Sequence, residues 1–415
     1  MTPMKRLRCW VGLLAALLAP AALPGTIDLG KLKRLRPIVD AIYRMDYPGA
    51  EALSRRLIQE SPDDPAGYVF LARTYWAREL NRQHALSMDR FAAPDFFQES
   101  KDYKYKLTVD PAAEQAFDAV TAQAIGKAKA LMKANPHAGG FLLGLAYSNQ
   151  ATFDASLTGS WWSAFRTGQK AVHLHRQVRA SNPDLADPLL AIGTYDYVAA
   201  SVPWTVRWLG LLIGAGLGSK ERGKQQIETA ASKAVLVAED ADVLLSLIYT
   251  RERDYGRAYA KVTALGQRYP QNYLLQLDRA GLARRMGQPE LAVQILSGIL
   301  RKIETGEDGY LRLERAVVHN RLGLTFRSAR DLRTAETWFR RVLADQGASP
   351  QPRIVAHLEL GKTLDLANRR GEAMAHYRAV AESENVHGSR QEAERLLKTA
   401  YREETVPASS PGPPR

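Results

Sequence analysis

Small apolar residues recur along this chain at a fixed distance before a proline. An alanine is followed twelve residues later by a proline at four places: Ala50–Pro62, Ala124–Pro136, Ala171–Pro183 and Ala258–Pro270. After three of these prolines a large residue, a Leu or Ile and a small residue follow in order: Tyr68-Leu71-Ala72, Leu142-Leu145-Ala146 and Leu189-Ile192-Gly193. A small residue lets two antiparallel helices cross closely, and a proline ends a helix. Together the two patterns predict a series of helical hairpins.

Two copies near the C-terminus repeat this register without a slip. In both, a glycine precedes an alanine by twelve residues, and an aromatic residue follows: His319-Leu322-Gly323-Ala335-Phe339 and His357-Leu360-Gly361-Ala373-Tyr377. These offsets resemble those of the tetratricopeptide-repeat (TPR) family, over about residues 38–402. The resemblance implies an all-α fold, a right-handed α-solenoid of helical hairpins. No strand-like run of alternating residues with hairpin turns interrupts the sequence.

Each second helix should carry one small residue at its crossing point. These residues are Ala50, Ala124, Ala171, Gly223, Ala258, Ala292, Ala335 and Ala373. A standard repeat has about 34 residues, close to the spacing from Gly223 to Ala292, whereas Ala50 and Ala124 are 74 residues apart. We therefore expect an irregular half with insertions (38–222) and a more regular half (223–402). The sequence leaves the conformation of 82–110 open.

The first 21 residues have the three parts of a secretory signal peptide. Lys5, Arg6 and Arg8 precede the apolar run Trp10–Leu18, and small residues follow it. The alternative is an uncleaved anchor, but the run is shorter than the ~20 residues that span a bilayer. The single cysteine, Cys9, lies before the run, so the mature chain has no thiol chemistry. We expect a periplasmic location, possible membrane association included, and a disordered proline-rich tail at 405–415.

The basic excess of the chain is spread along it. The formal net charge is +13, and without the three leader cations 54 basic residues face 44 acidic ones. Such charge fits ordinary solvated helix faces, or attraction to an anionic envelope polymer or a membrane surface. Nucleic acid is not an expected partner outside the cytoplasm.

The most apolar internal segment is Val202–Gly218, which interrupts the repeats. It is too short for a membrane helix and contains Arg207, so a buried helix with a glycine-rich turn is one interpretation. An interfacial helix with Trp204 and Trp208 at the headgroups is the other. With its flanks, the segment also resembles the middle of TPR proteins of the inclusion-body-clearance group, which implies a scaffold or adaptor role.

Motifs for catalysis are missing from the sequence. It has no Gly-x-Ser-x-Gly elbow, His-Glu-x-x-His helix or phosphate-binding loop. Of its eight histidines, His319 and His357 stand at the large position of their repeats, and His175 stands four residues after Ala171. His173 and His175 are two residues apart and would face different sides of a helix. We therefore expect no catalytic residue, no metal ligand and no cofactor, although carboxylate pairs for glycoside cleavage stay open.

Aromatic residues cluster on both sides of the third repeat. Trp161, Trp162 and Phe165 precede Ala171, and further aromatic residues follow it: Tyr195, Tyr197, Trp204 and Trp208. They could fill the gaps between long, irregular repeats, or anchor peptides or sugars through flat faces.

The TPR resemblance also implies where a partner would bind. In that family the first helix of each pair lines a concave groove, with residues one, five and eight positions after the large residue facing it. Here these residues are Arg73, Trp76, Tyr147, Gln150, Thr194, Tyr197, Asn320, Arg327, Lys362 and Asp365. The groove should be aromatic at its N-terminal end and polar, partly basic, at the other. Such a surface suits an extended peptide or an acidic chain terminus.

Two functions remain after this sequence analysis. The first is a non-enzymatic envelope scaffold that holds a protein or peptide partner in its groove. The second is a glycan- or peptidoglycan-associated protein, or an enzyme, with a site in the irregular half near 83–110 and the Trp161–Trp162 pair.

Overall fold

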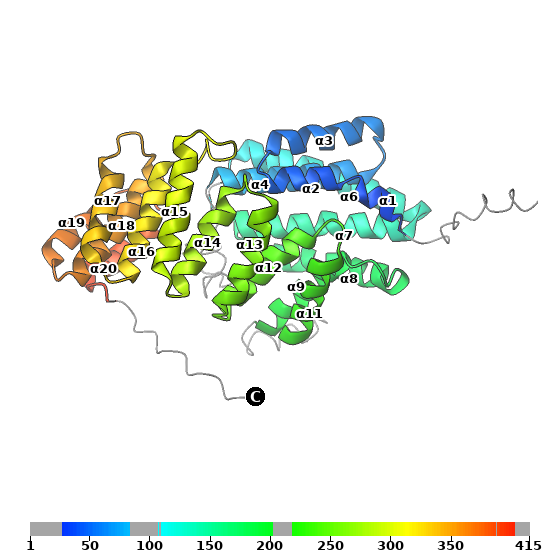
Figure 1. Ribbon diagram of the computed structural model, residues 1–415. Helices are drawn as coiled ribbons and strands as arrows, with labels where there is room; N and C mark the ends of the chain where they lie inside the picture. The colour runs from blue at the N-terminus through cyan, green and yellow to red at the C-terminus, as the bar shows by residue number, and fades with distance from the viewer. Residues whose placement is uncertain (1–26, 84–106, 108, 202–217, 387, 403–415) are drawn as a thin grey trace, which may run out of the picture.

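The computed structural model describes residues 27–83, 107, 109–201, 218–386 and 388–402. Over these residues it contains helices and no strand. The leader (1–21) and the tail (405–415) lie outside them. Figure 1 shows the helices following one another as a continuous array, so the all-α solenoid prediction is confirmed.

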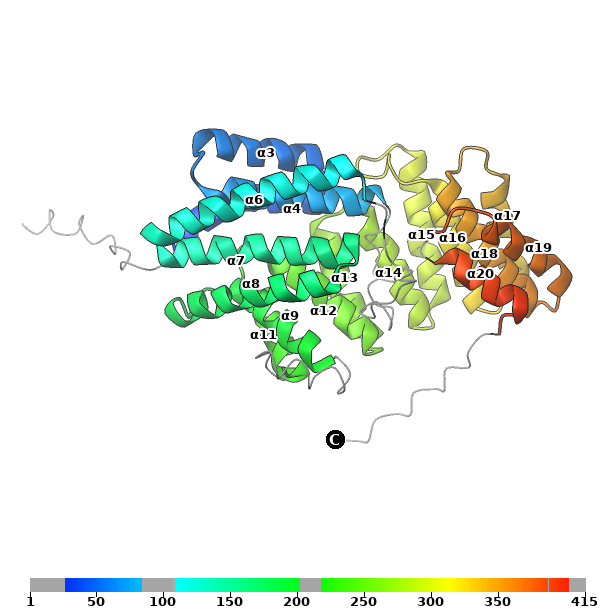
Figure 2. The ribbon, with the colours of Figure 1, turned by 180° about the vertical axis from the view of Figure 1, so that it is seen from behind.

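Successive helices pack as antiparallel pairs. In the N-terminal half a short α1 (Leu29–Lys33) precedes the pairs α2 (Arg36–Tyr43) with α3 (Tyr47–Glu60), α4 (Pro65–Arg82) with α6 (Pro111–Ala134), α7 (Pro136–Phe153) with α8 (Trp161–Ser181), and α9 (Pro188–Ser201) with α11 (Lys220–Lys233). A π-helical turn (Asp154–Thr158) joins α7 to α8. Figure 2 shows α6, α7 and α8 stacked as layers.

The C-terminal half continues with shorter helices. Its pairs are α12 (Ala238–Arg251) with α13 (Tyr255–Arg268), α14 (Tyr273–Arg285) with α15 (Pro289–Glu304), α16 (Arg315–Ser328) with α17 (Leu332–Ala344), and α18 (Pro350–Leu366) with α19 (Arg370–Ala381). A last helix, α20 (Ser389–Lys398), covers α18 and α19. Prolines begin many of these helices, where a missing N–H leaves no hydrogen bond unmade.

The predicted small residues all lie buried in the second helix of a pair. The first helix also needs a small residue where it meets the aromatic ring of the second. A Cβ on Gly323 would lie 2.5 Å from the Phe339 ring, and one on Gly361 would lie 2.5 Å from the Tyr377 ring. The repeat register read from the sequence is therefore the packing register of the fold.

The irregular half owes its long intervals to long helices as well as insertions. Helix α6 has 24 residues and α8 has 21, against 13 in α17 and 12 in α19. The segments 84–106 and 202–217 fall inside hairpins, between α4 and α6 and between α9 and α11. Both segments lie outside the described residues. The two interpretations of Val202–Gly218 therefore stay predictions, since only Gly218 of that stretch is described.

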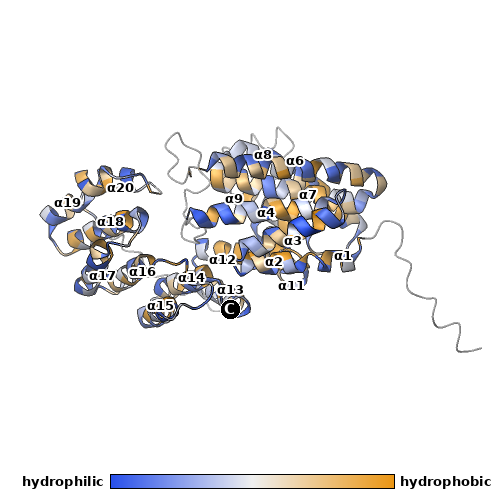
Figure 3. Ribbon diagram, turned by 90° about the horizontal axis from the view of Figure 1, so that it is seen from above, coloured by the Kyte–Doolittle hydropathy of each residue, from blue (hydrophilic) through white to orange (hydrophobic). Residues whose placement is uncertain are grey.

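The N-terminal hairpin folds back onto the middle of the chain. Figure 3 shows α2 beside α12 from above, and Leu32, Leu35 and Val39 share one apolar core with Leu236 and Val237. The solenoid therefore curls tightly enough for its first helices to meet others about 200 residues further along the chain.

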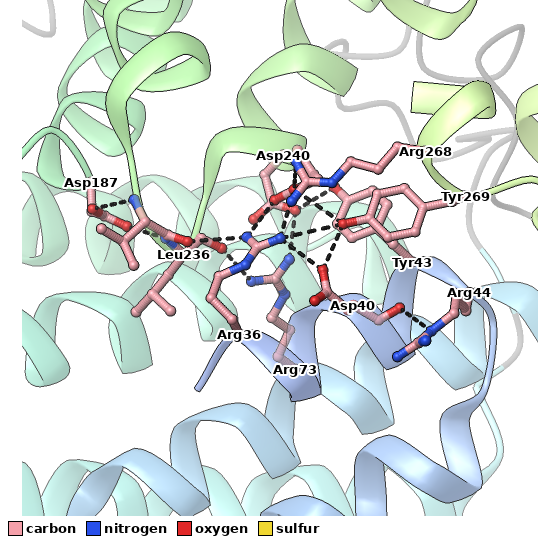
Figure 4. Close-up of polar contacts among 12 residues, drawn as sticks. Arg36, Asp40, Tyr43, Arg44, Arg73, Asp187, Leu236, Asp240, Arg268 and Tyr269 are labelled. Carbon is pink, nitrogen blue, oxygen red and sulfur yellow. Dashed lines mark hydrogen bonds and ion pairs between the residues drawn. The ribbon is translucent and has the colours of Figure 1, made fainter. Parts of the chain in front are cut away.

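A network of charged residues joins these helices at the same place (Figure 4). We call it the clasp: Arg36 and Asp40 of α2, Arg73 of α4, Glu239 and Asp240 of α12, and Arg268 and Tyr269 at the end of α13. Arg36 donates to both Glu239 carboxylate oxygens at 2.8 Å. Three cations face three anions, so the clasp is balanced internally.

Candidate partner-binding site

The concave residue Arg73 belongs to the clasp. It is buried, and its guanidinium donates to Asp240 Oδ1 at 2.7 Å. Although burial favours the neutral acid, the guanidiniums of Arg36 and Arg268 lower the pKa of the neighbouring Glu239. Arg73 is therefore buried and its charge is used within the protein, while partner binding by this residue stays a prediction.

The aromatic residues predicted for the groove are partly exposed. Trp76 donates its indole N–H to Ser156 Oγ at 2.9 Å and packs against the same apolar core as Tyr147. The Tyr147 ring lies 5.6 Å from the ammonium group of Lys170, and Gln150 is half-buried one turn further along α7. Aromatic faces thus lie along α4 and α7, while partner binding by these residues stays a prediction.

The concave residues of α9 and α12 line one hollow. Thr194, Tyr197 and Val198 come from α9, and Leu244, Leu247, Ile248 and Arg251 come from α12. Tyr197 is buried and its hydroxyl donates to Glu252 at 3.3 Å, and Thr194 donates to the carbonyl of Leu190. The hollow is therefore apolar, with a single guanidinium group among its lining side chains, and its volume of about 20 Å³ has room for about one water-sized group.

The α12 residues were missed by the sequence analysis. Val243, which is 37% exposed, and Leu247 stand one and five positions after Asp242, so both are at concave positions and Leu247 is the counterpart of Thr194. Helix α12 opens its repeat with Asp242 in place of a large residue, so the search for a large first residue passed over it. The small residue Ser246, twelve residues before Ala258, was the signal that could have identified this helix.

At the C-terminal end the predicted polar residues form a closed cluster. Arg327 and Lys362 both pair with Glu359, at 2.6 and 3.1 Å. Although burial favours the neutral acid, these two cations lower the pKa of Glu359 to about 2. Asn320 is buried and donates to the carbonyl of Pro352 at 2.8 Å, so it ties α16 to α18.

The chain covers this cluster with its own last described residues. The backbone N–H of Tyr401 donates to Asp365 Oδ2 at 2.7 Å. The Tyr401 ring lies 5.7 Å from the Arg327 guanidinium and 5.5 Å from the Lys362 ammonium. Asp365 also accepts from Arg370 and Tyr377. The basic end of the predicted groove is thus lidded by Tyr401.

The histidines at repeat positions are packing residues. His175 is buried with its ring edge-on to Phe141 and against Gly144, and burial lowers its pKa to about 4. The His319 ring lies 5.1 Å from the Trp338 ring and is tilted by 39° to it, and the Nδ1 atoms of His357 and His376 lie 2.9 Å apart. Within the described ranges, no three His, Cys, Asp or Glu side chains gather as a metal site would require.

The hairpins, their crossing residues and their order give one conclusion about architecture. The fold is a TPR-type α-solenoid. No family model matches the chain, and no curated protein matches it. Among the helices that the structure describes, none is long and apolar enough to span a bilayer.

Solved helical-repeat structures resemble it in arrangement only. Yeast Tom70 is 11% identical, covers 86% of each chain and has a TM-score of 0.39. The human IFIT1 dimer with m7Gppp-AAAA is 13% identical over 90% of this chain and 86% of its own, with a TM-score of 0.42. The TPR domain of P58(IPK) is 15% identical over 89% and 99%, with a TM-score of 0.23. At these scores the likenesses carry no argument about a ligand.

Proposed function

We propose that this protein is a non-enzymatic adaptor of the cell envelope that holds an extended apolar segment of a protein partner against its concave face. The supporting observation is the run of apolar side chains that α9 and α12 share; the hollow between them has a volume of only about 20 Å³, so a partner segment would lie across this face and not enter it. Val243 extends the same face with a large exposed apolar side chain. Exposed apolar side chains on a rigid concave scaffold suit docking of a partner segment.

Most of the ionisable groups of the clasp and of the C-terminal cluster are held in ion pairs. Cations lower the pKa values of Glu239 and Glu359, whereas burial raises that of Asp240 although it pairs with Arg73. A scaffold role accounts for these ion pairs without a reaction.

The location rests on the leader. Its cations, short apolar run and small residues fit export, and a mature chain without cysteine folds in an oxidising compartment without mispairing. Fusing residues 1–30 to an alkaline phosphatase that is active only after export tests this. Activity supports the envelope location, and an inactive fusion retained in the cytoplasm contradicts it.

Partner capture tests the concave face. The full chain and its Val243→Asp variant are immobilised and washed with envelope extract, beside a Leu311→Asp control at a loop residue that is 71% exposed. We expect the wild type and the control to retain one protein that Val243→Asp does not retain. Burying the new carboxylate in an apolar contact costs free energy and so weakens binding. Equal retention by all three proteins contradicts the proposal.

A further inference from the structure

A surface cleft lies on the outer side of the irregular half, between α8 and α11 with α9 as its floor. Its volume is about 520 Å³. Its lining comes from three helices: Arg176, Arg179, Ala180, Leu189, Ile192, Asp196, Arg222 and Gln226. None of these residues belongs to the concave hollow, so the cleft is a separate feature from the proposed partner-binding face.

A buried carboxylate positions two arginines at this cleft. Asp196 accepts from Arg222 Nε at 2.7 Å and from Arg176 Nη2 at 3.5 Å. The two arginine side chains are 56% and 53% exposed, while Asp196 is buried. Because Asp196 engages only one nitrogen of Arg222, the paired terminal nitrogens of that guanidinium stay available for a planar oxyanion.

The cleft carries an excess of positive charge. Arg179 donates to the carbonyls of Asn182 and Leu185, which are neutral groups. No carboxylate among the lining residues therefore neutralises the Arg179 guanidinium. Three arginines thus face one aspartate in the lining. An anionic ligand would meet a field of opposite sign there.

An aromatic strip continues from the cleft. Tyr195 lies next to Asp196, with the Arg176 guanidinium 5.8 Å from its ring. The Phe165 ring is 6.2 Å from Tyr195 and inclined by 24°, and Trp162 is 5.9 Å from Phe165 and inclined by 21°. Trp162 is 57% exposed. The strip thus brings one exposed aromatic side chain to the surface beside the basic cleft.

Two glycines fix the floor of the cleft. A Cβ on Gly193 would lie 2.7 Å from the carbonyl oxygen of Gly223, and a Cβ on Gly223 would lie 2.7 Å from that of Gly193. Helices α9 and α11 can therefore touch backbone to backbone. This contact holds Asp196 and Arg222 on a rigid support, which lowers the entropy lost on binding.

We propose that this outer cleft binds an anionic saccharide. The carboxylate of the saccharide lies against Arg222 and Arg176, and a sugar ring packs on the exposed Trp162, which ends the stacked row of Tyr195, Phe165 and Trp162. The exposed face of the Trp162 indole suits a flat, ring-shaped unit. A peptide also needs partners for its backbone, whereas the backbone groups of α8 and α9 are used within their helices.

Binding of defined oligosaccharides to the full chain tests this site. The probes are a tetramer of galacturonic acid, the same tetramer as its methyl ester, the disaccharide of N-acetylglucosamine and N-acetylmuramic acid, and tetraglutamate. We expect at least one acidic saccharide to bind by calorimetry, about tenfold more tightly than the neutral ester and tetraglutamate. Failure of both acidic saccharides, or equally tight binding of tetraglutamate, overturns the proposal.

Matched variants separate stacking from charge. Trp162→Ala should weaken binding of the acidic saccharide about tenfold, and Leu311→Ala should leave its affinity unchanged. Arg222→Gln should weaken binding of the acidic saccharide and leave the affinity for the methyl ester unchanged. Arg257→Gln is the control, because Arg257 is also an exposed arginine that donates through Nε to an aspartate, Asp254. If Trp162→Ala and Arg222→Gln bind as their controls do, the cleft is not the site. Loss of the protein partner is not expected in either variant, so this test stands apart from that of the concave face.

Discussion

Arg73 and Asp240 are 167 residues apart in the chain, and a 2.7 Å hydrogen bond joins their side chains. The arginine lies on the first helix of the second pair and the aspartate on the first helix of the fifth. This contact, with Arg36 and Glu239 beside it, joins the N-terminal helices to α12 where the solenoid curls back on itself. The clasp therefore ties together the two ends of this curl.

Breaking this pair should destabilise the fold. In Arg73→Met the carboxylate of Asp240 keeps its half-buried position and its hydrogen bond from Tyr43 but loses its cation, so the cost is below the roughly 3–5 kcal/mol of breaking a fully buried pair. Urea unfolding followed by circular dichroism measures the loss. The double variant Arg73→Met, Asp240→Leu should recover most of it, because neither charge is then left alone. A double variant as unstable as the single one contradicts this account.

The crossing residues give a prediction of local packing. Ala335 is fully buried between α16 and α17, so Ala335→Leu should force the helices apart at a cost of about 1–3 kcal/mol. Thr337→Leu on the exposed side of the same helix is the matched control. Thermal melting distinguishes them. A pair of variants with the same melting temperature would show that the register is wrong.

The repeat register was predictable because each offset lies within one hairpin. The twelve-residue step from Gly361 to Ala373 and the ring of Tyr377 are local, and every such step is buried as expected. The clasp was not predictable in this way. Curvature is the sum of small rotations at each hairpin, so no local pattern places Arg36 beside Glu239.

The candidate site was predicted in part for the same reason. Trp76 and Tyr147 follow from the register, and their contacts place them on the inner helices. The lid over Arg327 and Lys362 depends on where the chain turns after α20, and the cleft at Asp196 depends on two glycines meeting across a hairpin. Neither has a periodic signature in the sequence.

Acid should destabilise the protein through its buried histidine. The pKa of His175 is lowered to about 4 by burial, below its value of about 6.5 in the unfolded chain. The unfolded state therefore binds more protons between these values, and stability falls as the pH falls from about 6.5 to 4. His175 contributes about 3 kcal/mol to this loss. Urea unfolding at pH 7 and pH 4 measures it.

The variant His175→Phe keeps a ring in the same place and cannot titrate. Its stability should change less between these two pH values than that of the wild type. A variant with the same acid loss as the wild type would show that His175 is not responsible.

The lid at the basic end gives a prediction about charge. Tyr401→Ala uncovers Arg327 and Lys362, each of which loses a contact worth about 0.5–1 kcal/mol. We expect tetraglutamate to bind severalfold more tightly to the variant at low salt, with the gain removed at high salt by screening. Calorimetry at two salt concentrations measures both. An unchanged affinity at low salt means that Tyr401 covers no binding surface.

The most direct test of the central claim is to ask which face touches the partner. A photo-crosslinking residue is placed at Val243 on the concave face, at Tyr147 two hairpin pairs away, and at Leu311 as an exposed control, and each full-length protein is irradiated in envelope extract. We predict that positions 243 and 147 attach to the same protein and that position 311 attaches to none. Crosslinks from position 311 alone, or from none of the three, would contradict a concave partner-binding face.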